Sequence, residues 1–166
     1  MILGVTTSTY TLIHVVISLI GIGSGLVVLW GMMRNKPLDG ITAIFLAFTV
    51  LTSLTGFGFP FTHVTPGIIV GVISMVLLAL AITARYGFHL AGPWRLIYVV
   101  TALMALYLNV FVLVVQSFEK VPALHALAPT QSEPPFMGTQ LVVLVVFIIL
   151  TLFAGRKFHP APASAA

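Results

Sequence analysis

The chain alternates between long apolar runs and short polar connections. Five runs are long enough to cross a bilayer core about 30 Å thick, which takes roughly 20 apolar residues in a helix. They cover residues 9–33, 40–59, 66–84, 94–116 and 139–155. The pattern predicts an all-α integral membrane protein with five transmembrane helices in a single domain, residues 1–158. The Ala/Pro-rich residues 159–166 are expected to form a disordered tail.

Glycine and proline mark the connections between these runs. Pro37 and Gly40 stop one helix and restart the next after residue 33. Thr65 directly precedes Pro66, which predicts a threonine N-cap followed by proline at the first helical position. The connections therefore support the same five boundaries.

Composition places the chain far from soluble proteins and excludes several functions. Hydrophobic residues make up 60% of the 166 positions, charged residues 6%, and the mean hydropathy is +1.19. The absence of cysteine excludes disulfides, iron–sulfur clusters and thiol redox chemistry. The net charge of +4 comes from basic residues scattered along the chain, so no stripe that could follow nucleic-acid phosphates is predicted.

The basic residues also predict an orientation. Cytoplasmic connections of membrane proteins carry an excess of Lys and Arg. With five spans, one side holds six of the seven basic residues, namely Arg34, Lys36, Arg85, Arg95, Arg156 and Lys157. We therefore expect the N-terminus outside and the C-terminus in the cytoplasm. The expected location is a bacterial inner (plasma) membrane, with the long polar loop on its outer face.

Small and polar residues form one stripe on each of the first four spans. Membrane helices approach each other through such faces, so four stripes predict a four-helix bundle. The stripes are His14, Ser18, Gly21 and Gly25; Thr42, Thr49, Ser53, Gly56 and Pro60; Gly67, Gly71, Ser74 and Ala81; and Tyr98, Thr101, Ala105, Asn109 and Gln116. The fifth span is apolar on every face. It is expected at the periphery, against lipid or another subunit.

The longest polar passage, residues 117–138, is predicted to be a folded outer loop, and the ionisable residues concentrate on its side. Imidazole and carboxylate groups suit a transition metal, and the candidate ligands are His14, His63, His125 and Glu133. Two of these, His14 and His63, could instead be axial ligands of a b-type haem. Gln116, Asn109 and Glu119 are further candidates for a polar lining.

Each of these residues also has a structural interpretation. An intramembrane histidine near a helix end can simply bond a neighbouring helix, and Glu133 can cap a turn. The sequence contains no HxxxH or HExxH motif that would favour a metal. The convergence of the outer histidines is therefore a hypothesis that the sequence leaves open.

Several functions remain compatible with the sequence. The first is a redox or metal-handling membrane protein with an outward-facing site. The second is a non-catalytic subunit or scaffold that docks through its fifth helix, within a homo-oligomer or a larger membrane complex. The third is handling of lipid, quinone or a small solute, although no span carries a charged residue well inside the membrane for a coupled transport cycle. The sequence does not decide whether the protein is an enzyme.

Overall fold

The computed structural model describes residues 4–60 and 65–160. Five helices are long and apolar enough to cross a membrane: α1 (Thr7–Met33), α2 (Asp39–Phe57), α3 (Pro66–Ile82), α4 (Trp94–Lys120) and α6 (Pro134–Lys157). A π-helical turn, η1 (Thr83–Gly87), continues α3, and a short helix, α5 (Pro122–Leu127), lies between α4 and α6. All of these elements are helical, so the predicted class of an all-α integral membrane protein is confirmed.

Local sequence signals account for the helix starts. Thr65 is the N-cap of α3, where its hydroxyl accepts a hydrogen bond from the Ile68 N–H at 3.4 Å, and Pro66 takes the first helical position. This confirms the predicted cap. Thr6 caps α1 in the same way, since its hydroxyl oxygen lies 3.2 Å from the Thr9 nitrogen.

The long polar passage, predicted to be a loop over residues 117–138, contains helix. Helix α4 continues to Lys120 rather than ending at residue 116, and α6 begins at Pro134 rather than at residue 139. Between them, Pro122 starts the short helix α5. Proline disrupts a helix interior, but in the first turn it sacrifices no helical hydrogen bond. The prolines here begin helices, and the connection that remains is shorter than predicted.

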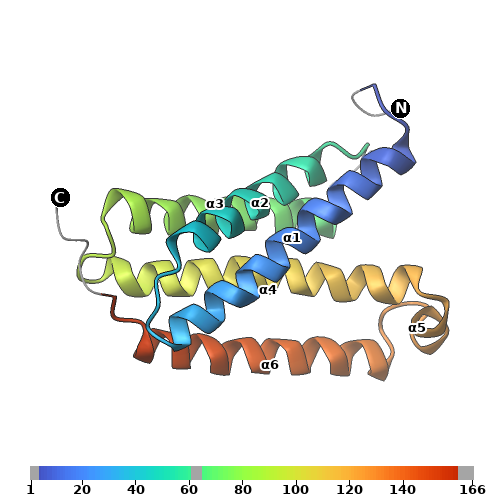
Figure 1. Ribbon diagram of the computed structural model, residues 1–166. Coiled ribbons are helices and arrows are strands. Elements are labelled where there is room, and N and C mark those ends of the chain that lie inside the picture. The colour runs from blue at the N-terminus through green and yellow to red at the C-terminus, as the bar shows by residue number, and fades with distance from the viewer. Residues whose placement is uncertain (1–3, 61–64, 161–166) are drawn as a thin grey trace.

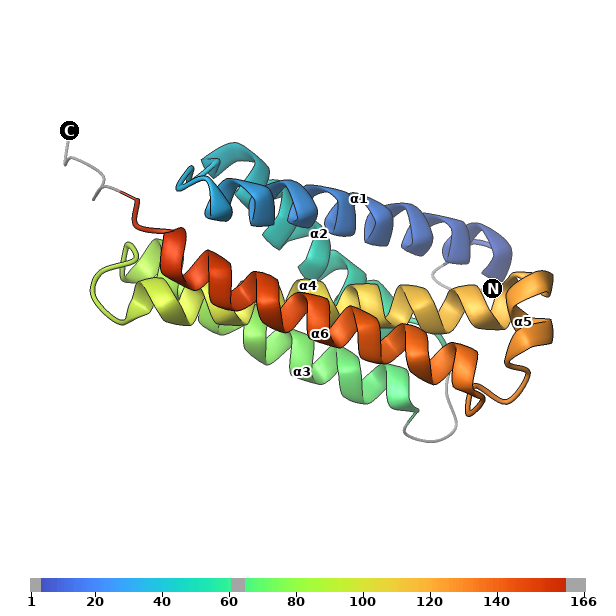
Figure 2. The ribbon, with the colours of Figure 1, turned by 90° about the horizontal axis from the view of Figure 1, so that it is seen from below.

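Helix α4 is the centre of the arrangement, because it contacts α1, α2, α3, α5 and α6. Helix α6 runs alongside α4 in both overall views (Figures 1 and 2). The most extensive pairing is between α1 and α2. Figure 1 shows that α1 separates from α4 toward its own N-terminus. Helix α1 thus crosses α4 at an angle, and its last residues lie at the same end of the molecule as the first residues of α4 (Figures 1 and 2).

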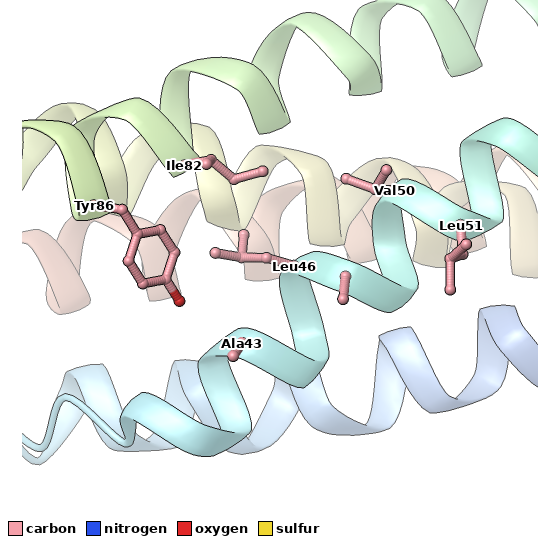
Figure 3. A pocket seen from close by; sticks show the side chains of 7 residues that line it. Ala43, Leu46, Val50, Leu51, Ile82 and Tyr86 are labelled. Atoms are coloured by element: carbon pink, nitrogen blue, oxygen red, sulfur yellow. The ribbon is translucent and has the colours of Figure 1, made fainter.

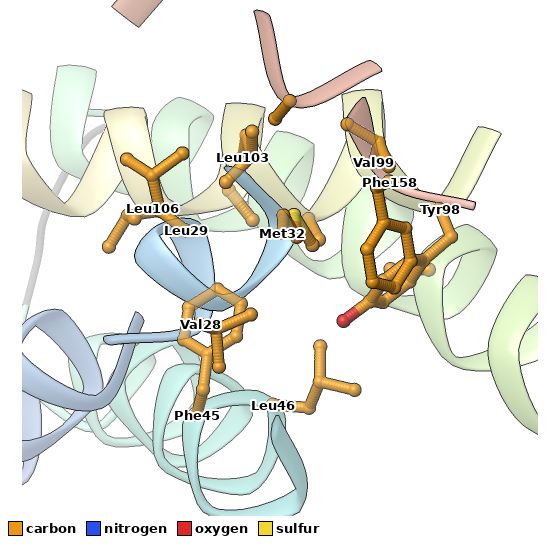
Figure 4. Close-up of a cluster of buried hydrophobic side chains, with 14 of the residues drawn as sticks. Val28, Leu29, Met32, Phe45, Leu46, Tyr98, Val99, Leu103, Leu106 and Phe158 are labelled. Carbon is orange, nitrogen blue, oxygen red and sulfur yellow. The ribbon is translucent and has the colours of Figure 1, made fainter. Parts of the chain in front are cut away.

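The hydrophobic core lies at this same end. Figure 4 shows side chains from the second half of α1, the first half of α2 and the first half of α4, together with the aromatic ring that follows α6. The labelled members are Val28, Leu29, Met32, Phe45, Leu46, Tyr98, Val99, Leu103, Leu106 and Phe158. In the first half of α1, by contrast, Tyr10 is the buried residue. Packing is therefore dense at one end of the molecule and loose at the other.

Many members of the predicted small and polar stripes are buried, whereas Pro60 and Gly67 are exposed. Six of their polar members are buried: Thr42, Thr49, Ser53, Ser74, Thr101 and Asn109. Gly21 and Gly25 of α1 are buried as well. Helix α6 buries Phe147 and Ala154 and contacts both α4 and α1. Most of its remaining apolar surface is exposed.

Candidate functional site

His14 lies in the loosely packed half of α1, against the end of α2. Its Nδ1 atom is 2.7 Å from the hydroxyl oxygen of Thr55. The ring meets Phe59 edge to face, with 5.3 Å between the centroids. Gly56 lies beside the ring, where a Cβ atom would be in ordinary van der Waals contact with His14 Cε1 at 3.7 Å. Tyr10 holds the same two helices together through a 2.8 Å hydrogen bond to the Thr55 carbonyl oxygen.

The contacts of Thr55 favour a proton on Nδ1 of His14. The Thr55 hydroxyl lies 2.7 Å from the Leu51 carbonyl oxygen, one helical turn earlier. A carbonyl can only accept, so the single hydroxyl hydrogen of Thr55 is donated to Leu51. The Thr55 oxygen then accepts from His14 Nδ1–H. In the neutral ring this leaves Nε2 with a lone pair, which can bind a metal or accept a hydrogen bond.

The carboxylate of Glu133 forms hydrogen bonds within its own turn. Its carboxylate accepts hydrogen bonds from the Thr130 hydroxyl at 2.8 Å and from the backbone N–H groups of Thr130 and Ser132, both at 3.1 Å. Desolvation acts to raise the pKa of Glu133, but these hydrogen bonds outweigh it and lower the pKa below its ordinary value. The structural role that the sequence left open for this residue is thus the one observed.

Among the described residues, the other predicted ligands do not form a metal-binding group with His14. His125 is exposed on α5, and His63 lies outside the described residues. Within residues 4–60 and 65–160, no three His, Asp or Glu side chains come close enough to hold a metal ion. A metal site made of several side chains has no support in this part of the chain.

The predicted polar lining is divided between separate places on α4. Gln116 donates from Nε2 to a carboxylate oxygen of Glu119 at 3.3 Å, on the exposed side of the helix end. Asn109 is buried, and its Nδ2 atom has no hydrogen-bond partner among the described residues. Neither Gln116 nor Asn109 forms a hydrogen bond with the His14 ring, whose partner is Thr55.

A second polar cluster was not predicted. Arg85 of η1 is buried and forms an ion pair with Asp39, the first residue of α2. It also donates to the Pro37 carbonyl oxygen at 3.1 Å, and its guanidinium carbon lies 5.2 Å from the centre of the Tyr98 ring. The helical register contained a signal, because Arg85 follows the buried positions Ser74, Leu78 and Ala81 on the same face of the α3 helix.

Five spanning helices, a helical core and a histidine in the loosely packed half of α1 define this chain as an integral membrane protein with a candidate ligand site. Comparison with protein-family models, with curated proteins and with solved structures found no match. Function must therefore be argued from the residues themselves.

Proposed function

We propose that the protein binds a b-type haem through His14 Nε2 and serves a redox role in the membrane. The observation that carries this proposal is the 2.7 Å contact between His14 Nδ1 and the Thr55 hydroxyl oxygen, because the contact of that hydroxyl with the Leu51 carbonyl favours the tautomer with its lone pair on Nε2. Histidines that bind metals usually donate their other ring N–H to a fixed acceptor, which orients the ring and increases its basicity. Thr55 supplies that acceptor here.

Haem is favoured over a metal ion held by side chains because one histidine is enough to hold haem iron in many proteins. The described residues offer no group of three ligands to a metal ion. Apolar side chains flank residue 14 along α1, since the neighbouring Ile13 and Val15 are both exposed. A porphyrin is largely apolar and suits such surroundings.

The distribution of basic residues supports the topology that goes with this proposal. In it, the N-terminus and His14 lie toward the outer face of a bacterial plasma membrane, and the six basic residues of the other side lie in the cytoplasm. The helices form a bundle with α6 at its periphery. His14 then lies within reach of partners outside the cell or in the periplasm.

A second candidate function is that of a non-catalytic subunit or scaffold. It is favoured by α6, which buries the smallest share of its surface among the five spans. In this role the exposed apolar face of α6 would pack against another membrane protein, and no cofactor would be needed.

One experiment separates the two functions. The protein is purified in mild detergent from cells supplied with haem, and its absorption spectrum and metal content are measured. We expect a Soret band that is lost in His14→Ala and retained in His125→Ala, a matched histidine on an exposed helix. Thr55→Val should keep the side-chain shape, remove the hydrogen-bond acceptor and lower haem affinity by about 10–100-fold.

The opposite result is equally clear. A colourless wild type without stoichiometric metal, or a His14→Ala variant that keeps its full Soret band, would refute haem binding at this histidine. A colourless protein that copurifies with a defined membrane partner would support the subunit role instead.

A further inference from the structure

A groove runs between α2 and the end of α3. It has a volume of about 510 Å³ and is open on one side (Figure 3). Its lining residues are Ala43, Leu46, Ala47, Val50, Leu51, Ile82 and Tyr86. The two alanines of α2 leave space that larger side chains would fill. The volume lies within the range of sites for small molecules, which is about 300–1,000 Å³.

The groove is apolar along its length and becomes polar at one end. Tyr86 extends from η1 toward α2 at this end, so its hydroxyl group lies beside an otherwise hydrocarbon lining (Figure 3). Asp39 lies one helical turn before Ala43 on the same face of α2. The ion pair with Arg85 fixes Asp39 next to η1. A carboxylate and a phenol therefore mark the end of the groove.

The carboxylate of Asp39 can accept further hydrogen bonds. Arg85 donates a hydrogen bond to Oδ1 of Asp39, while no described residue donates to Oδ2. The side chain is 83% exposed. Two cations, Arg34 and Lys36, are exposed in the connection that leads into α2. Negative and positive groups thus lie close together in the chain at the polar end of an apolar groove.

We propose that this groove binds a phosphatidylethanolamine molecule. One acyl chain occupies the apolar groove, and the primary ammonium of the headgroup donates to Asp39 Oδ2, with Tyr86 as a further hydrogen-bond partner. The chemistry selects this lipid because its ammonium carries N–H donors. A choline headgroup has no N–H to donate, and a glycerol headgroup has no cation to complement the carboxylate.

The test measures which lipids the intact protein retains. Wild type is exchanged into mixed micelles with equal amounts of phosphatidylethanolamine, phosphatidylcholine and phosphatidylglycerol, and the bound lipids are counted by native mass spectrometry. We expect phosphatidylethanolamine to be preferred by about tenfold, as one charge-assisted hydrogen bond would give. Equal retention of the three lipids by wild type would overturn the proposal.

Two variants examine the two parts of the site. Asp39→Asn should abolish the preference between headgroups, and Ala47→Trp should fill the groove and remove bound lipid without touching Asp39. Val142→Trp is the control, because residue 142 is an exposed position on α6 outside the groove. If Ala47→Trp keeps the wild-type preference, the proposal is wrong even where Asp39→Asn fails to fold. His14→Ala should leave lipid retention unchanged, so this proposal and the haem proposal fail independently.

Discussion

Gly25 offers a direct test of how tightly the core is packed. A Cβ atom at this position would lie 2.6 Å from Leu106 Cδ1 and 2.8 Å from the nearest Phe45 ring atoms. Both neighbours are completely buried, so neither can move aside without disturbing the core. Gly23 is two residues away in the same helix, and a Cβ atom there would meet nothing within 4 Å. The pair separates packing from helix propensity.

The magnitude follows from these two contributions. Replacing glycine by alanine inside a helix stabilises it by about 1 kcal/mol, and this gain applies to both positions. Overfilling a packed core costs about 1–3 kcal/mol, and this cost applies only to Gly25. We therefore expect Gly23→Ala to raise the free energy of unfolding slightly. Gly25→Ala should be less stable than Gly23→Ala by about 1–3 kcal/mol.

The measurement is equilibrium unfolding of wild type, Gly23→Ala and Gly25→Ala in mixed detergent micelles, followed by far-ultraviolet circular dichroism. The difference between the two variants is the decisive quantity, because the propensity contribution cancels. Equal stabilities within about 0.5 kcal/mol, the usual effect of a surface substitution, would show that the contact between α1, α2 and α4 at Gly25 is not as close as described.

Two further predictions concern the chain after α4. Arg95 donates from Nη1 to the carbonyl oxygens of Gly155 and Phe158, at 2.8 and 2.7 Å. Arg95→Gln should therefore speed amide hydrogen exchange at the end of α6 and lower the free energy of unfolding by about 1–3 kcal/mol. Unchanged exchange in this variant would contradict the prediction. The lowered pKa of Glu133 means that its stabilisation of the Thr130–Glu133 turn is fully present above the unfolded-state pKa and is lost as pH falls through the folded-state value. Amide exchange at Thr130, corrected for its intrinsic pH dependence, should therefore accelerate on acidification in wild type, while a matching pH dependence in Glu133→Gln would refute the role of the carboxylate.

Hydrophobic length and punctuation were sufficient to predict the five spans, because a bilayer-sized apolar run can satisfy its backbone only as a helix. The same signals misjudged residues 117–138. The passage is not a loop throughout, because Pro122 and Pro134 occupy the first turns of α5 and α6. Whether a proline starts or stops a helix depends on which neighbouring residues adopt helical geometry, and the polar composition of this passage gave no apolar period to indicate it.

The sites were harder to predict than the spans because they depend on how helices pair. His14 stood out as an intramembrane histidine, but its partner Thr55 is 41 positions away, and only the packing of α1 on α2 brings them together. From the sequence, Arg85 is predicted only to lie on the cytoplasmic side. Its burial follows from the register of α3, because Arg85 continues the face of Ser74, Leu78 and Ala81.

Because packing is uneven, substitutions at the two proposed sites differ in how strongly they affect the stability of the fold. The core at the end of α1 joins α1, α2, α3, α4 and α6, so substitutions there are felt by the whole fold. His14 lies in the half of α1 where few side chains are buried, and its removal deletes one hydrogen bond and one aromatic contact. Loss of a ligand in His14→Ala would therefore report on binding rather than on unfolding. Asp39 differs, because it also neutralises the buried Arg85, so that its substitution can destabilise the fold. For that reason the Ala47→Trp variant, which fills the groove, is the sharper test of lipid binding.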